Sequence, residues 1–132
     1  MQILVDSSVW IDYFTGAATP ETDYLDSLIG DFPLVVADVV MERVLSGLRD
    51  EAQRRQAWDA LTSFWLVEVR GVHLAWWSAV NYQKLRARRI KVRREECRLA
   101  TFCITEGFAL LHCSRGYKPF EKHLGLTVAR PE

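Results

Sequence analysis

Two short apolar runs near the start of the chain each end at an acid and lead into a helical pattern. Residues 2–5 run into Asp6, and residues 33–37 run into Asp38. Three further apolar runs come later, at 64–69, 108–112 and 125–129. Helical patterns separate these runs, and strands that alternate with helices predict a parallel sheet covered by helices on both faces. We therefore expect an α/β fold.

The helical patterns carry start and stop signals. Residues 19–30 open with Thr19 as a candidate N-cap and Pro20 at the first helical position, and Gly30 ends them. Asp38 is a candidate cap for the next helix, which Gly47 ends. The other expected helices cover 7–14, 51–63, 72–89 and 93–107. Without repeats or a linker, residues 1–132 are expected to form a single domain.

The charge balance excludes a general attraction to nucleic acid, because the 17 basic side chains equal the 17 acidic ones. Residues 84–98 nevertheless hold eight of the basic residues. The candidates for contact with RNA or with a protein partner are Arg86, Arg88, Arg89, Lys91, Arg93 and Arg94. Such a cluster suits phosphates, but it also suits an acidic partner or a solvated helix end. RNA contact and protein contact stay open equally.

Cysteine usage and hydropathy bear on location. The three cysteines show no CxxC spacing, so we expect reduced thiols and not a disulfide framework. No apolar stretch approaches the length of a membrane span, and the first residues lack the pattern of a signal peptide. We expect a cytoplasmic protein without a membrane partner.

Polar side chains follow three of the apolar runs, at Asp6, Asp38 and His112–Cys113. In a parallel α/β sheet, ligands bind at the carboxyl ends of the strands. Asp6 is therefore a candidate for a shared metal site, with a helix cap near Ser7 as the alternative interpretation. His112 and Cys113 would favour a softer metal such as Zn²⁺, although a single cysteine is more often a small buried apolar residue.

Four segments occur in a set order: LVDSSVWIDYF, ADVVMERVLSGLRD, LATFCITEGFALLH and HLGL. Together they closely resemble PIN domains, specifically the VapC-type toxins of type II toxin–antitoxin pairs, over about residues 2–127. The resemblance implies a PIN-like three-layer α/β/α sandwich with a four- or five-stranded parallel sheet. It also implies metal-dependent RNA cleavage, a homodimer and a VapB-like antitoxin partner.

The family holds Mg²⁺ or Mn²⁺ with three or four acids, which suits cations that prefer oxygen ligands. The resemblance places the first acid at Asp6 and a second, one methylene longer than usual, at Glu96. The other family positions are altered, to Arg43, Ser114 and Gly116. The pattern therefore predicts that only Asp6 and Glu96 remain of the catalytic and metal-binding site.

These changes predict a pseudoenzyme: a toxin homologue with lost or weakened activity that acts by binding RNA, an antitoxin-like partner or itself. In this interpretation Arg43 takes the place of the metal and pairs with Asp6 and Glu96, and no cofactor is expected. The alternative is an active Mg²⁺- or Mn²⁺-dependent endoribonuclease with a rearranged acid set. That set is Asp6, Glu42, Glu95 and Glu96.

The tryptophans give expectations about packing. Trp10 and Trp65 lie in apolar patterns and are expected in the core. Trp76 and Trp77 are adjacent on a predicted helix and cannot share one face, so one of them is expected at the surface or at an interface.

Overall fold

Four parallel strands form one sheet at the centre of the computed structural model, which describes residues 1–131. The strands are β1 (Ile3–Val5), β2 (Leu34–Ala37), β3 (Trp65–Val67) and β4 (Ala109–Leu111). Their order in the sheet is β3-β2-β1-β4. Leu4 on β1 pairs with Val35 on β2 and with Leu110 on β4. The predicted parallel sheet is confirmed.

The fifth expected strand, at 125–129, contributes only one bridge, between Val128 and Leu110. Leu110 donates its N–H to the carbonyl of Thr127 at 2.9 Å, and Ala129 donates to the carbonyl of Leu110 at 2.9 Å. The segment therefore lies beside β4 without extending the sheet by a full strand, and the four-stranded form of the prediction is the one observed.

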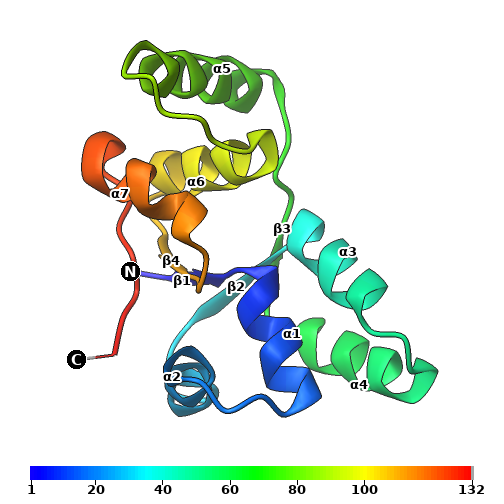
Figure 1. The fold of residues 1–132 in the computed structure, drawn as a ribbon. Coiled ribbons are helices and arrows are strands. Elements are labelled where there is room, and N and C mark those ends of the chain that lie inside the picture. Colours follow the sequence, from blue (N-terminus) through cyan, green and yellow to red (C-terminus); the bar gives the residue numbers. More distant parts are fainter. Residues whose placement is uncertain (132) are drawn as a thin grey trace.

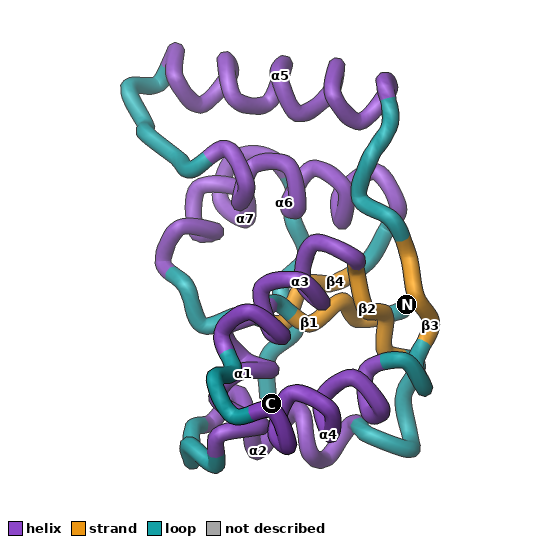
Figure 2. Tube along the Cα trace, turned by 90° about the vertical axis from the view of Figure 1, so that its right-hand side faces the viewer, coloured by secondary structure: helices purple, strands orange, loops and turns teal. Residues whose placement is uncertain are grey.

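Helices cover both faces of the sheet, as Figure 1 shows. The elements are α1 (Ser7–Thr15), α2 (Pro20–Leu28), α3 (Asp38–Gly47), α4 (Glu51–Leu61), α5 (Val72–Ala87), α6 (Arg94–Glu106), the 3₁₀ turn η1 (Arg115–Tyr117) and α7 (Lys118–Leu124). In Figure 1, α5, α6 and α7 lie above the sheet and α1, α2 and α4 below it. Figure 2 shows α5 as an outer tier beyond α6 and α7, and α5 packs mainly on α6.

The predicted cap at Thr19 is confirmed, whereas the predicted cap at Asp38 is wrong, because Asp38 is the first residue of α3 and Ala37 stands at the N-cap position without a side-chain cap hydrogen bond. Thr19 accepts the N–H of Thr22 at 3.0 Å, and the Thr22 hydroxyl accepts the N–H of Thr19 at 2.9 Å, which makes a reciprocal capping box. Asp38 has another role at the start of α3. Its carboxylate accepts the N–H of Val39 at 2.8 Å and that of Val69 at 2.9 Å. Asp38 therefore ties the start of α3 to the segment that follows β3.

The sheet and the inner helix faces form one apolar core. Trp10 is buried there, as expected, and stacks on Phe14 with 5.6 Å between ring centroids. Trp65 contradicts the expectation, since it is 54% exposed. It lies on β3, which is an edge strand of the sheet.

Both tryptophans of α5, Trp76 and Trp77, are exposed, so one more aromatic side chain is at the surface than the sequence predicted. Along residues 1–131, no helix combines the length and the apolar character needed to cross a bilayer.

Candidate functional site

Asp6 follows β1 directly and is 5% exposed. Its backbone N–H donates to the carbonyl of Leu111 at 2.9 Å, which fixes its position beside the end of β4. One carboxylate oxygen accepts the hydroxyl of Ser8 at 3.3 Å, and the other accepts the hydroxyl of Tyr117 at 3.3 Å. Asp6 stands at the N-cap position of α1, but its side chain makes no cap hydrogen bond. The carboxylate therefore bonds to Ser8 and Tyr117 beside the end of β1 and does not cap the helix.

Burial raises the pKa of Asp6 above its ordinary value, because desolvation penalises the charged carboxylate. The backbone N–H of Ser7, the positive charge of Arg43 and the two hydroxyl donors act in the opposite direction and only partly compensate. The pKa of Tyr117 is also raised, first by burial and then by the negative charge of Asp6. Tyr117 therefore keeps its proton and serves Asp6 as a hydrogen-bond donor.

Glu96 lies in the first turn of α6 and belongs to a second group of hydrogen bonds. Its Oε2 accepts the hydroxyl of Ser114 at 2.9 Å, and the same Ser114 oxygen accepts the N–H of Gly116 at 3.1 Å. The carboxylate lies directly against Gly116, where a Cβ would collide with it. His112 accepts the N–H of Ser114 on Nδ1 at 3.1 Å. Asp6 and Glu96 are thus each bound to protein donors.

The predicted pairing of Arg43 with these acids is wrong. Arg43 is half-buried on α3, and within residues 1–131 it makes no hydrogen bond or ion pair with Asp6 or Glu96. The donors that Asp6 does have are the hydroxyl groups of Ser8 and Tyr117, one on each carboxylate oxygen, and Glu96 has that of Ser114. Arg43 still lowers the pKa of Asp6 through its charge, so it acts on the site at longer range.

The rearranged acid set is not assembled either. Glu42 lines a groove beside β3 together with Trp58 and Leu66, and Glu95 is exposed. Across the described residues 1–131, no group of three or more His, Cys, Asp and Glu side chains is placed to hold a metal ion. One step along a helix rotates a side chain by about 100°, which separates Glu42 from position 43 and Glu95 from Glu96.

The same finding bears on His112 and Cys113. The hydrogen bond from Ser114 uses Nδ1 of His112, and the Cys113 side chain is exposed. The pair therefore does not form part of a metal cluster in the described part of the chain.

The donor set at the strand ends does not fit Mg²⁺ or Mn²⁺. Such ions require several oxygen ligands with room for water. Here Asp6 and Glu96 already accept hydrogen bonds from protein hydroxyls, and the positive charge of Arg43 is close enough to act on Asp6. Sequence analysis missed Tyr117 as the partner of Asp6, since 111 positions separate the two residues and no motif links them.

The six candidate contact residues are all exposed and lie together at the end of α5, in the following loop and at the start of α6. They are Arg86, Arg88, Arg89, Lys91, Arg93 and Arg94. Arg89 has a positive φ of 63°, a backbone region that side chains other than glycine seldom adopt. The basic residues are therefore solvent-accessible around this turn, while their ligand stays a prediction.

No model of a protein family matches the chain. Among solved structures, it is similar to a chain of VapBC2 from Rickettsia felis bound to a promoter DNA fragment, with 12% identity over 100% of both chains and a TM-score of 0.76. It is also similar to a chain of VapBC-1 from nontypeable Haemophilus influenzae, with 13% identity over 98% of both chains and a TM-score of 0.72. DNA-bound VapBC from Salmonella typhimurium aligns at 8% identity over 98% of this chain and 97% of that one, with a TM-score of 0.70. The chain therefore has the PIN-like fold that occurs in VapBC toxin–antitoxin complexes.

Proposed function

We propose that this protein is a VapC-like toxin homologue that has lost its metal-dependent ribonuclease site and acts by binding. The observation that carries the proposal is that both remaining acids, Asp6 and Glu96, already accept hydrogen bonds from protein hydroxyl groups. Asp6 is bonded to Ser8 and Tyr117, and Glu96 is bonded to Ser114. A cation would have to displace these hydroxyl donors and overcome the charge of Arg43.

The binding role includes a VapB-like antitoxin, a second copy of the chain and RNA as ligands. The similar solved structures are VapBC complexes, which supports the antitoxin. An apolar groove of about 400 Å³ between α3, α4 and β3 supports a protein ligand, and Met41, Trp58 and Leu66 are among its lining residues. The basic surface around residues 86–94 supports RNA. We place the protein in the cytoplasm.

Calorimetric titration with Mn²⁺ tests the loss of the metal site. The wild type and an Asp6→Ala variant are titrated side by side, with Asp59→Ala, on the exposed face of α4, as a control for the general loss of one carboxylate. We expect no binding heat in any of the three. Heat in the wild type and in Asp59→Ala that disappears in Asp6→Ala would contradict the proposal, and an RNA cleavage assay would then be the next step.

Restoring the family's acids tests whether the scaffold around the site is otherwise intact. The variant combines Arg43→Glu, Ser114→Asp and Gly116→Asp with Glu96→Asp, because a residue larger than glycine at 116 needs the space that the longer Glu96 fills. We expect the fourfold variant to bind Mn²⁺. A folded variant without binding heat would mean that the crevice itself has been remodelled.

A further inference from the structure

A cavity of about 390 Å³ lies between α5 and α6, on the side of α6 that faces away from the sheet. Its size falls within the range of small-ligand sites. The residues that line it are Ala75, Ser78, Ala79, Tyr82, Gln83, Arg94, Cys97 and Arg98. The space exists because α5 presents short side chains, Ala75, Ser78 and Ala79, where it faces α6.

The lining contains two guanidinium groups and no carboxylate. Arg94 and Arg98 are four residues apart on α6, so they lie on the same face of that helix. Neither forms an ion pair with any residue from 1 to 131. The first turn of α6 holds two acids, and neither lines the cavity: Glu96 is bonded to Ser114, and Glu95 is exposed and forms no ion pair with any residue from 1 to 131. The cavity is therefore a cationic site without an internal counter-ion.

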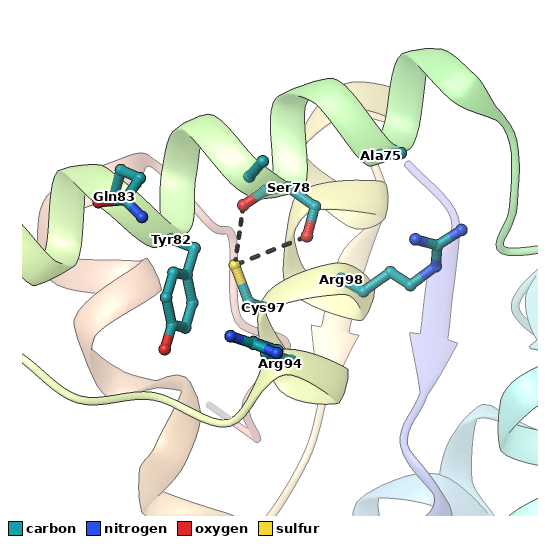
Figure 3. Close-up of a pocket in the computed structure, with 8 residues that line it drawn as sticks. Ala75, Ser78, Tyr82, Gln83, Arg94, Cys97 and Arg98 are labelled. Carbon is teal, nitrogen blue, oxygen red and sulfur yellow. Dashed lines mark hydrogen bonds between the residues drawn. The ribbon is translucent and has the colours of Figure 1, made fainter.

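Both arginines are held in place. Arg94 lies over the ring of Tyr82, with 5.5 Å from its guanidinium carbon to the ring centroid. Arg98 donates from Nε to the carbonyl of Val69 at 3.5 Å, which leaves its terminal nitrogens unused by that bond. Figure 3 shows Tyr82 and Arg94 at one end of the cavity, Arg98 at the other and Cys97 between them.

The floor and rim add neutral polar groups. Cys97 donates to the carbonyl of Ser78 at 3.4 Å, and the Ser78 hydroxyl lies 3.8 Å from the Cys97 sulfur. The Gln83 amide stands at the rim next to Tyr82. Burial raises the pKa of the Cys97 thiol, so this sulfur is a neutral hydrogen-bonding group.

We propose that this cavity binds a nucleotide, with the base stacked on the Tyr82–Arg94 pair at one end and the phosphate held by Arg98 at the other. Planar guanidinium and aromatic groups stack on nucleobases, and the terminal nitrogens of a single guanidinium group bind phosphate through fork-shaped hydrogen bonds. The exposed residues Arg88, Arg89, Lys91 and Arg93 border this end of α5 and α6 and raise the local concentration of phosphate. The nucleotide is either free or one unit of an RNA strand. This inference gives a ligand to the binding role proposed above and rests on it.

The probes are AMP and UMP, inorganic phosphate, adenosine, and a fluorescein-labelled ten-residue oligouridylate RNA. Calorimetry follows the small molecules and fluorescence anisotropy follows the RNA, each at two salt concentrations. We expect a free nucleotide or the RNA to bind more tightly than either phosphate or adenosine, because base and phosphate are held together. Phosphate that binds as tightly as the nucleotide would mean an adventitious anion only and would overturn the proposal.

Variants test the lining. Arg94→Ala/Arg98→Ala should weaken binding at least about tenfold, and for RNA it should reduce the slope of log affinity against log salt by about 0.7 for the phosphate contact of Arg98. Arg54→Ala/Arg55→Ala on α4 removes the same charge on the opposite face of the sheet and should change affinity less than about twofold. An equal loss of affinity in both double variants would mean that binding depends only on the overall positive charge of the protein. That result would overturn the proposal.

Stacking is tested by Tyr82→Leu, which should weaken binding at least about fivefold, while Tyr82→Phe should stay within about twofold. Arg94→Ala alone serves as a second probe that leaves the Arg98–Val69 bond in place. Binding of AMP that depends on these residues identifies a free nucleotide, and dependence seen only with the oligouridylate identifies an RNA strand. If neither AMP nor the RNA binds, or if Tyr82→Leu binds as tightly as the wild type, the proposal of a nucleotide site in this cavity is overturned. Neither outcome changes what the Mn²⁺ titration says about the metal site. The failure of this inference is thus distinguishable from the failure of the proposed function.

Discussion

The carboxylate of Glu96 occupies the space that the first side-chain carbon of any residue larger than glycine at position 116 would need. Ser114 holds it there through a hydrogen bond of 2.9 Å. Two departures from the family's acid pattern, a longer acid at 96 and a glycine at 116, are therefore structurally dependent on each other. The third, Ser114, supplies the donor that fixes the arrangement.

This dependence predicts a coupling between Gly116 and Ser114. Gly116→Ala should lower the free energy of unfolding by about 1 kcal/mol, because the flexible end of Glu96 must swing away and give up its hydrogen bond with Ser114. In a Ser114→Ala background that bond is already absent, so the same glycine change should cost much less. Urea denaturation of the two single variants and the double variant measures the difference. Additive costs would contradict the dependence.

The buried carboxylate of Asp6 predicts a pH-dependent penalty on stability. Because the pKa of Asp6 is raised above 3.8, the folded protein binds this proton more tightly than the unfolded chain does. The stability that the group contributes is fully present below about pH 3.8 and is lost as the pH rises through the raised pKa. Asp6→Asn should therefore melt a few degrees higher than the wild type at pH 7, with the advantage shrinking toward pH 4.

Asp59→Asn, an exposed change on α4, is the control for Asp6→Asn and should not alter the pH dependence of melting. A melting temperature for Asp6→Asn at or below that of the wild type at pH 7 would show that the hydroxyl donors compensate for burial.

The hydrogen bond from the Val69 N–H to the Asp38 carboxylate predicts that Asp38 protects the Val69 amide from hydrogen exchange. Asp38→Ala should cost about 1–3 kcal/mol, because the N–H of Val69, a residue only 3% exposed, loses its acceptor. Hydrogen exchange at the Val69 amide should accelerate in the same variant. Asp38→Asn keeps an acceptor oxygen and should be milder. Asp50→Ala removes the cap of α4 at Ala52 and should leave exchange at Val69 unchanged.

The end of α5 predicts a stabilising substitution. Arg89 takes the left-handed backbone position, with φ 63°, while Ile90 donates back to the carbonyl of Leu85 at 3.0 Å. Arg89→Gly should raise the free energy of unfolding by about 1 kcal/mol. Arg88→Gly is the matched control, since Arg88 has an ordinary φ of −89° and gains nothing from glycine. A loss of stability in Arg89→Gly would mean that this side chain makes a compensating interaction.

Local patterns were sufficient to predict most of the fold. The apolar runs ending at Asp6 and Asp38 predicted β1 and β2, and the Thr19–Pro20 signal predicted the start of α2. Trp65 was misplaced because apolar alternation predicts a strand but not its position in the sheet. Only the order β3-β2-β1-β4 puts Trp65 on an edge.

The candidate site was predictable only in part. Resemblance gave the positions Asp6, Arg43 and Glu96, but charge alone suggested that the arginine would pair with the acids. The actual partners are neutral hydroxyls, those of Tyr117 and Ser114, which η1 and the turn before it bring to the strand ends. Such contacts depend on tertiary distances that no spacing in the sequence encodes.

The stacking of α5 mainly on α6 has a consequence for how this protein can change over time. α5 places only Leu74 and Leu85 in the main core, so most substitutions on its other faces should leave folding intact. A ligand bound between α5 and α6 would hold the two helices together. It should therefore slow amide exchange along α5 while leaving amide exchange in the sheet unchanged.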